Sequence, residues 1–381
     1  MLDAVRLAVP PTRADQVGSL LRPAALLAER ERFNRGEISA ETLRAAEDTA
    51  IRGVIATQES LGLQVVTDGE YRRGLYSDNF TETALTGVTM EEDASAWAFQ
   101  GGGKKHSAAP LMRVVDRIRW SGLSHNAADF AFLKANTSRI AKITLPGPAF
   151  IHYRAGRGNI SRDVYPDLDL FWSDLAEAYR QELEALHRAG CTYVQLDETS
   201  LAKFGDPKIQ QGLAARGDDW RTLLHTYVDA LNAVADAAPP GLLLAIHLCR
   251  GNNQGQWQAE GGYEAVAEVL FNKLRIPLLL LEFDTPRAGS LDVLKTLPEG
   301  KAVVLGLVST KTGELESREL LLSRLREAAT HASIEQLAIS PQCGFASVEH
   351  GNPITPEQQA AKLRRCVEIA AEVWGSVAGG G

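Results

Sequence analysis

Short apolar runs recur along the chain, separated by longer stretches in which apolar residues return every three or four positions. The runs are continuously apolar rather than alternating, which is typical of parallel strands covered on both faces. They predict eight strands, at 13–19, 63–69, 141–147, 192–198, 242–249, 277–284, 302–309 and 337–343. The intervening pattern predicts helices at 39–61, 166–189, 218–237, 261–273, 314–331 and 355–374. This alternation predicts an α/β fold, the (β/α)8 TIM barrel.

One interval between predicted strands is much longer than the others. Residues 85–137 hold three consecutive glycines, Gly101 to Gly103, and the run LMRVVDRIRWSG, and they predict an insertion with a hairpin and a short helix between strands 2 and 3. Because the segment follows a strand, we expect it over the C-terminal mouth of the barrel. The whole chain, 1–381, is then one barrel carrying this insertion.

Composition narrows the class of protein. The net charge of −8 argues against a general nucleic-acid binder, which would carry a basic surface. Four cysteines in 381 residues are too few for a disulfide scaffold. There is no run of 18 apolar residues and no signal-peptide pattern, so neither a membrane span nor secretion is expected. A cytoplasmic enzyme with no membrane or nucleic-acid partner is the expectation, and the sequence does not indicate an oligomeric state.

Polar side chains gather where the predicted strands end, which is where the active site of this fold lies. His247 and Cys249 stand two apart on one strand, so they share a face and lie about 7 Å apart at the backbone. Glu282 and Cys343 end two other strands. Mixed sulfur, nitrogen and oxygen ligands favour Zn²⁺ over magnesium or calcium. A buried cysteine is also commonly a small core residue, and this is the interpretation for Cys191 and Cys366.

Seven motifs in order carry a resemblance to a known family: VGSLLRP (17–23), TDGEYRR (67–73), LPGP (145–148), YVQLDE (193–198), HLCRGN (247–252), LEFD (281–284) and ISPQCGF (339–345). Across about 13–375, the chain resembles the C-terminal catalytic barrel of cobalamin-independent methionine synthase, and most closely the short, single-barrel branch. The resemblance implies a zinc ion held by His247, Cys249, Glu282 and Cys343. It also implies homocysteine contacts at Val17, Gly18, Ser19, Glu70 and Asp197.

Two further residues are candidate substrate contacts. Tyr76 follows Glu70 in the loop after the second predicted strand, and Arg72 lies in the same loop. Glu70 and Asp197 together suit the ammonium group of an amino acid. The alternative is that they form buried ion pairs with Arg72 or Arg73.

The chemistry expected of such a site is alkyl transfer to sulfur. Binding to zinc lowers the pKa of a thiol, so a thiolate forms at neutral pH and can accept an alkyl group without redox change. We therefore predict a zinc-dependent thiol alkyltransferase, a methyltransferase that makes methionine from homocysteine. Glu282 is expected to leave the ion as the substrate sulfur arrives.

Two departures from the family concern the alkyl donor. Arg154 stands where the family has a tryptophan beside the pterin, and Lys311 stands near the position of its catalytic histidine. The donor stays open among methylfolate, a methylated corrinoid and an epoxide, the last as in epoxyalkane:coenzyme M transferases. Coenzyme M is a thiol that carries a sulfonate, so it would favour binding by Arg72, Arg73 or Arg154. The carboxylates of Glu70 and Asp197 instead favour a thiol that carries an amino group. A zinc-free decarboxylase resembling uroporphyrinogen decarboxylase is a second alternative, disfavoured by the His, Cys, Glu and Cys set.

Overall fold

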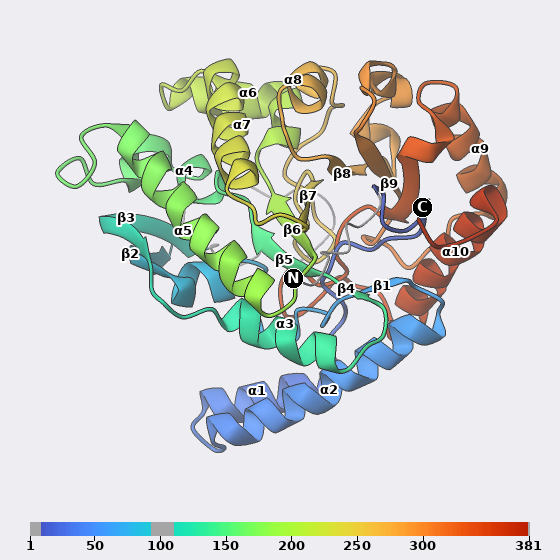
Figure 1. Ribbon diagram of the computed structural model, residues 1–381, viewed down its shortest axis with the longest axis horizontal. Helices are drawn as coiled ribbons and strands as arrows, with labels where there is room; N and C mark the ends of the chain where they lie inside the picture. The colour runs from blue at the N-terminus through green and yellow to red at the C-terminus, as the bar shows by residue number, and fades with distance from the viewer. Residues whose placement is uncertain (1–8, 93–109, 380–381) are drawn as a thin grey trace.

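In the computed structural model, which describes residues 9–92 and 110–379, parallel strands form a barrel with helices around the outside (Figure 1). The barrel strands are β1 (Val65–Val66), β4 (Ile140–Ala141), β5 (Ile143–Pro146), β6 (Tyr193–Glu198), β7 (Leu243–Leu248), β8 (Leu278–Glu282), β9 (Ala302–Val308) and β10 (Leu337–Pro341). All eight predicted strand regions contribute to the barrel. β4 and β5 are two parts of the third region, and the first region contributes only the bridge at Ala14. The predicted (β/α)8 barrel is confirmed.

Backbone pairing runs around the barrel. One sheet has the order β10-β9-β8-β7-β6-β5, all parallel. β1 pairs with β4, and the amide of Lys142 donates to Val66, which joins β1 to the start of β5. Ala14 bridges to Ile339 of β10 in parallel. Every strand therefore presents its C-terminal end at the same mouth.

Helices cover the strands. They are α1 (Ala24–Asn34), α2 (Ala40–Ser60), α3 (His125–Ala135), α4 (Phe150–Tyr153), α5 (Leu168–Arg188), α6 (Pro207–Ala215), α7 (Trp220–Asp236), α8 (Ala267–Asn272), α9 (Arg318–Ala329) and α10 (Pro356–Trp374). The Ser39 hydroxyl caps α2 by accepting from the amide of Thr42 at 3.2 Å. The sequence patterns missed α1, α4 and α6, which are short. Among the described residues, no helix has the length and apolar character that crossing a bilayer requires.

The insertion between the second and third strands contains the predicted hairpin and helix. Its hairpin pairs β2 (Leu85–Glu92) with β3 (Pro110–Trp120) in antiparallel fashion, and α3 follows. The hairpin lies beside α5 (Figure 1), where Arg117 pairs with Asp174 at 2.5 Å and the indole of Trp120 donates to Glu182 at 2.8 Å. Residues 93–109, which include the three glycines, lie outside the described residues. The position of this segment over the mouth stays a prediction.

The inward faces of the strands build the floor of the site. Small and branched residues fill the barrel: Val65, Tyr193, Leu243, Ala245, Leu278, Leu280, Ala302, Val304 and Ala338. Because side chains alternate along a strand, the inward face continues two residues later in each case. His247 lies two positions after Ala245, and Glu282 lies two positions after Leu280. Asp197 lies four positions after Tyr193, with Gln195 between them on the same face. The same period that packs the core therefore aims these polar groups at the mouth.

Candidate active site

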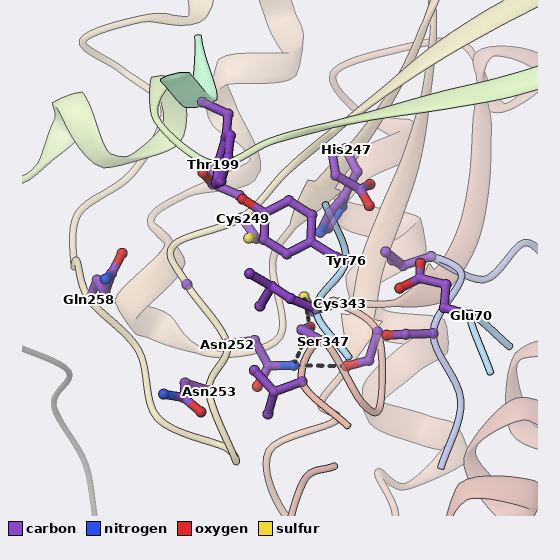
Figure 2. Close-up of a pocket in the computed structure, with 18 of the residues that line it drawn as sticks. Glu70, Tyr76, Thr199, His247, Cys249, Asn252, Asn253, Gln258, Cys343 and Ser347 are labelled. Carbon is purple, nitrogen blue, oxygen red and sulfur yellow. Dashed lines mark hydrogen bonds between the residues drawn. The ribbon is translucent and has the colours of Figure 1, made fainter. Parts of the chain in front are cut away.

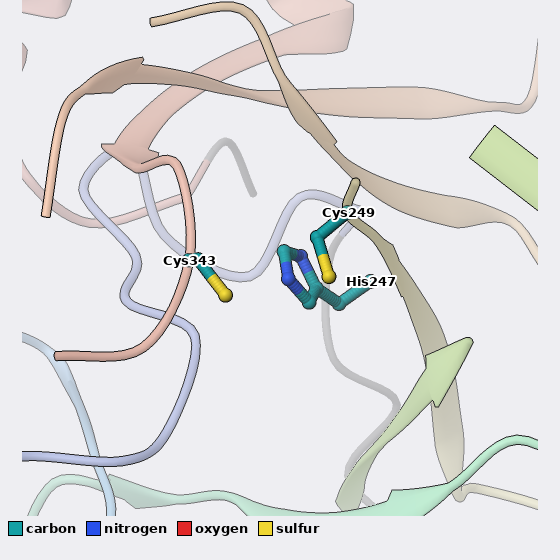
Figure 3. Close-up of side chains that lie close together, drawn as sticks. All are labelled: His247, Cys249 and Cys343. Atoms are coloured by element: carbon teal, nitrogen blue, oxygen red, sulfur yellow. The ribbon is translucent and has the colours of Figure 1, made fainter. Parts of the chain in front are cut away.

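Three of the predicted metal ligands converge at the barrel mouth. The ligand atoms of His247, Cys249 and Cys343 all lie within 4.8 Å of one another, and all three side chains are buried. Figure 3 shows both cysteine side chains pointing toward the imidazole ring. Tetrahedral zinc with Zn–S bonds near 2.3 Å separates two ligating sulfurs by about 3.7 Å, so the cluster has the right size.

The protonation chemistry of this cluster also suits a metal. Contact with the Cys343 sulfur and the nearby His247 lower the pKa of the Cys249 thiol well below its usual value, despite burial. Both ring nitrogens of His247 are buried and have no hydrogen-bond partner among the described residues. Buried polar atoms without a partner are rare and costly, and an ion between the three side chains would satisfy them. The donor set of two thiols and one imidazole therefore fits zinc.

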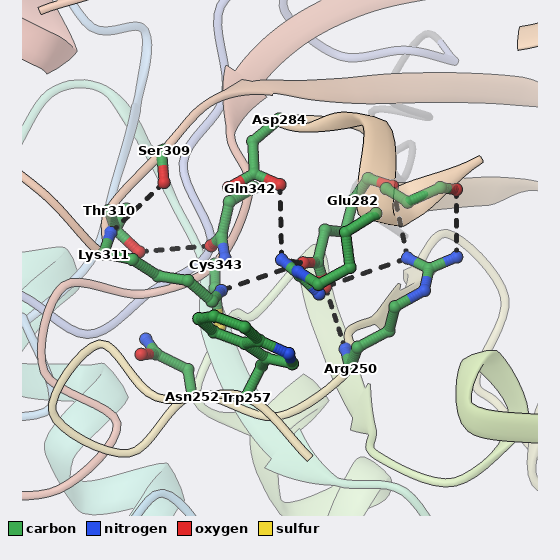
Figure 4. A network of polar contacts seen from close by, with 12 residues as sticks. Arg250, Asn252, Trp257, Glu282, Asp284, Ser309, Thr310, Lys311, Gln342 and Cys343 are labelled. Atoms are coloured by element: carbon green, nitrogen blue, oxygen red, sulfur yellow. Dashed lines mark hydrogen bonds and ion pairs between the residues drawn. The ribbon is translucent and has the colours of Figure 1, made fainter. Parts of the chain in front are cut away.

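Glu282 lies outside that three-residue cluster. Its Oε1 contacts Arg287 at 2.5 Å and Lys311 at 3.7 Å, and its Oε2 accepts from the backbone amide of Arg250 at 2.8 Å. Figure 4 shows Lys311 and Arg250 directed at the Glu282 carboxylate. Burial would raise the pKa of Glu282, but Lys311, Arg250 and Arg287 outweigh it and lower the pKa to about 2. Its predicted role as the fourth ligand stays a proposal, and it would require the carboxylate to leave Arg287.

Glu70 and Asp197 meet at the same cavity. Burial, reinforced by Glu70, raises the pKa of Asp197 to about 7, although His247 opposes the shift. Burial also raises the pKa of Glu70, against the pull of Arg73. Glu70 Oε1 accepts from the Thr144 hydroxyl at 2.8 Å, while its buried Oε2 has no partner among the described residues. Two buried carboxyl groups with spare acceptor capacity are chemically suited to a cationic group.

A polar network under Asp197 holds it in place, and the sequence analysis missed it. The amide nitrogen of Gln195 donates to Asp197 Oδ1 and to the Val17 carbonyl, both at 2.7 Å. The amide oxygen of Gln195 accepts from Lys142 at 3.0 Å, and Lys142 also pairs with Asp15 at 2.8 Å. Because an ammonium can only donate, Lys142 fixes which end of the Gln195 amide faces Asp197. The alternation along YVQLDE could have placed Gln195 one layer below Asp197.

The first predicted strand supplies the remaining predicted thiol contacts. Val17 and Ser19 line the cavity. Gly18 is required by close approach, because a Cβ there would lie 2.8 Å from Glu70 Oε1 and 2.7 Å from Thr144 Cγ2. Gly18 therefore makes room for the Glu70 side chain.

Tyr76 lines the cavity and Arg72 does not. The Tyr76 ring packs edge-on against Phe150, with centroids 5.8 Å apart. The guanidinium of Arg72 instead faces acids outside the cavity, Glu47, Asp48 and Asp129. We therefore remove Arg72 from the proposed substrate contacts. The alternative, a buried ion pair of Arg72 with Glu70 or Asp197, is also wrong, because the partners of Arg72 are other acids.

The cavity has a volume of about 120 Å³ and is partly open to solvent. Figure 2 shows Glu70, His247, Cys249 and Cys343 around it. Sequence reasoning missed three of its polar lining residues: Lys203, Asn252 and Gln258. The Asn252 amide donates to the Gly344 carbonyl at 2.8 Å and so ties the loop after Cys343 to the loop after β7. Asn252 lies within HLCRGN, whereas Lys203 lies after its strand in a short 3-10 helix, Leu201–Gly205, that no periodicity predicts.

The other two cysteines lie away from the cavity. Cys191 and Cys366 are fully buried and free, and burial raises the pKa of both thiols, that of Cys191 to about 12. This agrees with their interpretation as packing residues.

Comparison with known proteins adds an independent finding. The family model described as the catalytic domain of cobalamin-independent synthase matches residues 11–372. The uncharacterised protein YxjH of Bacillus subtilis is 39% identical over 370 residues, which are 96% of this chain and 95% of that protein. A methionine synthase of Pyrococcus abyssi is 26% identical over 90% of this chain and 88% of its own length.

A solved structure is also similar. A candidate vitamin-B12 independent methionine synthase from Listeria monocytogenes superposes with a TM-score of 0.76 at 33% sequence identity. The match covers 97% of this chain and 100% of that one.

Proposed function

From the premise that this chain belongs to the family of cobalamin-independent synthase catalytic domains, we propose that it transfers a methyl group to the thiol of homocysteine at a zinc ion. The single observation that carries the proposal is the convergence of His247, Cys249 and Cys343 beside the buried carboxyl pair of Glu70 and Asp197. The similarity to a methionine synthase over nearly its whole length supports the reaction class.

The proposed metal ligands are His247, Cys249 and Cys343, with Glu282 as an exchangeable fourth. A bound zinc ion would lower the pKa of the substrate thiol and keep its sulfur nucleophilic. Two cysteine thiolates cancel the formal charge of the ion, so the arrangement favours a nucleophilic sulfur over activation of water. This argues against a hydrolase and against the zinc-free decarboxylase.

The chain's own residues orient the thiol. Glu70 and Asp197 hold the ammonium group, and Ser19 and Val17 form the wall beside them. In the transfer, a bond forms between sulfur and the alkyl carbon while the bond from that carbon to its leaving group breaks. The leaving group departs with the electron pair, so no oxidant or reductant is needed. Tyr76 and Phe150 contribute an apolar wall that limits the access of water.

The alternative thiol is coenzyme M, with an epoxide as the alkyl donor. It has one observation in its favour, because cationic Arg154 lines the cavity. It leaves Glu70 and Asp197 without a cationic ligand group, since coenzyme M has no amine. The paired carboxyl groups therefore favour homocysteine.

A thiol panel crossed with alkyl donors tests the proposal. Homocysteine, coenzyme M and glutathione are each combined with methylfolate, methylcobalamin and a small epoxide, and loss of free thiol is measured. We expect turnover with homocysteine and a methyl donor. Turnover with coenzyme M alone would contradict the assignment of Glu70 and Asp197.

A further inference from the structure

Lys203 is unusual among the buried lysines of this protein. The described residues contain four buried lysines, and three have a carboxylate oxygen within 4.0 Å: Lys142 with Asp15 at 2.8 Å, Lys362 with Glu316 at 3.1 Å and Lys311 with Glu282 at 3.7 Å. Lys203 is 3% exposed, and no carboxylate of the described residues lies within that distance of its Nζ. Among the described residues it is therefore the buried lysine that has no carboxylate at salt-bridge distance.

The direct contacts of Lys203 are with neutral groups. Its Nζ donates to the neutral side-chain oxygen of Gln258 and lies 5.3 Å from the centre of the Tyr153 ring. Burial lowers the pKa of Lys203 to about 8, and Arg154 lowers it further against the opposing field of Glu198 and Cys249. A buried charge paired only with neutral groups is costly, and proteins keep such groups where a ligand repays the cost.

Arg154 adds a second positive charge to the same wall. It lines the cavity together with Lys203, and the two come from the segments after β5 and β6. Like charges held near each other are unfavourable unless an anion lies between or beside them. Arginine and lysine are the side chains that bind carboxylate, sulfonate and phosphate groups.

The acidic and basic groups line the same cavity as the sulfur cluster. Cys249 contributes to the electrostatic environment of both Asp197 and Lys203. An ammonium group at Glu70 and Asp197 would therefore leave Lys203, on the wall that Arg154 also lines, to a negatively charged group.

We propose that Lys203 and Arg154 form a receptor for an anionic group, a carboxylate, sulfonate or phosphate, carried by one of the two substrates. The two possible sources are the carboxylate of the thiol acceptor and an acidic group of the alkyl donor. Only this assignment to a substrate rests on the proposed function; the anion receptor itself follows from the burial of Lys203 with no carboxylate at salt-bridge distance among the described residues.

Measuring ligand binding to the zinc-loaded protein distinguishes the two possible sources of the anionic group and does not require turnover. The probes for calorimetric titration are homocysteine, 3-aminopropanethiol, which lacks the carboxylate, and 5-methyltetrahydrofolate, which carries carboxylates on the donor side. The variants are Lys203→Met, Lys203→Arg and, as a matched control, Lys208→Met, which removes an exposed lysine of α6. We expect Lys203→Met to weaken an anionic probe at least tenfold, Lys203→Arg to retain most of the affinity, and Lys208→Met to change nothing.

The pattern identifies the source. Weakened homocysteine with unchanged 3-aminopropanethiol places the acceptor carboxylate at Lys203, whereas weakened methyltetrahydrofolate alone places the donor there. Unchanged affinity for both anionic probes, or no binding of either to the wild-type protein, would overturn the proposal. Anion binding that depends on Lys203 in a protein that alkylates no thiol would refute the proposed function and leave the anion receptor standing.

Thermal unfolding gives a second readout that requires no ligand. Lys203→Met removes a buried charge that has no carboxylate at salt-bridge distance among the described residues, so the melting temperature of the free protein should rise. Lys362→Met removes one partner of a buried ion pair, so the melting temperature should fall. A fall in both variants would mean that Lys203 is a structural residue and would overturn the proposal.

Discussion

Replacing Gln195 with methionine should destabilise the fold and displace Asp197. The substitution keeps the length of the side chain but removes the amide that donates to Asp197 Oδ1 and to the Val17 carbonyl, both at 2.7 Å. A buried acceptor left without its donor costs about 1–3 kcal/mol, so two of them cost about 2–6 kcal/mol. Asp197 can turn toward the cavity, which recovers part of this. We expect a loss of about 2–4 kcal/mol in the free energy of unfolding.

Urea denaturation measures this loss, with Gln181→Met as a control because the Gln181 amide bonds Glu177 on the surface. The control should change stability by less than about 0.5 kcal/mol. A further variant, Gln195→Glu, keeps an acceptor for Lys142 but places its second oxygen against two acceptors, so it should also be destabilised. Wild-type stability in both Gln195 variants would refute the role of Lys142 in fixing the amide. In the methionine variant, KM for the thiol should rise more than kcat falls.

The remaining predictions concern the metal, the pH dependence of stability and Arg72. Cys343→Ser should lose zinc and activity together, whereas the control Cys366→Ser should keep both. Metal analysis and the thiol assay measure this. If Cys343→Ser keeps its zinc and its full turnover, Cys343 is not a zinc ligand. Burial lowers the pKa of His152 to about 4, so as the pH falls from about 6.5 to 4 the unfolded chain takes up a proton that the folded chain does not. His152 should therefore contribute a loss of about 3 kcal/mol across this window, measured as the difference between the wild type and His152→Gln in urea titrations, because Asp197 titrates in the same range with the opposite sign; the same pH dependence in both proteins would refute the assignment. Arg72→Met should lower the melting temperature without changing KM for the thiol, and a raised KM would return Arg72 to the substrate site.

Strand periodicity accounts for most of what the sequence could predict. The continuously apolar runs predicted seven of the eight strand regions, because parallel strands buried on both faces have few polar interruptions. The first region, 13–19, is not apolar and contributes only a bridge at Ala14. Because the strands run in one direction, the polar residues at their ends, such as His247 and Asp197, could be placed together at one mouth of the barrel. Cys343 could be brought to His247 only by assuming that the barrel closes, which the structure confirms.

The residues that sequence analysis missed depend on contacts between distant segments. Arg72 and Arg73 are neighbours in the chain, yet Arg72 faces acids of α2 and α3 while Arg73 donates to Thr144 near the cavity. No local pattern distinguishes the two. Lys203 likewise reads as an ordinary loop lysine until its burial and lack of a carboxylate partner are seen. Glu282 was correctly placed at a strand end, but the three cations around its carboxylate come from separate loops.

The most direct test of the account is the zinc content of protein purified without chelators, measured together with thiol alkylation before and after removal of the metal. The account predicts about one zinc per chain, loss of alkylation on removal, and recovery when zinc is restored. A protein that holds no zinc and still alkylates homocysteine at its full rate would contradict the account.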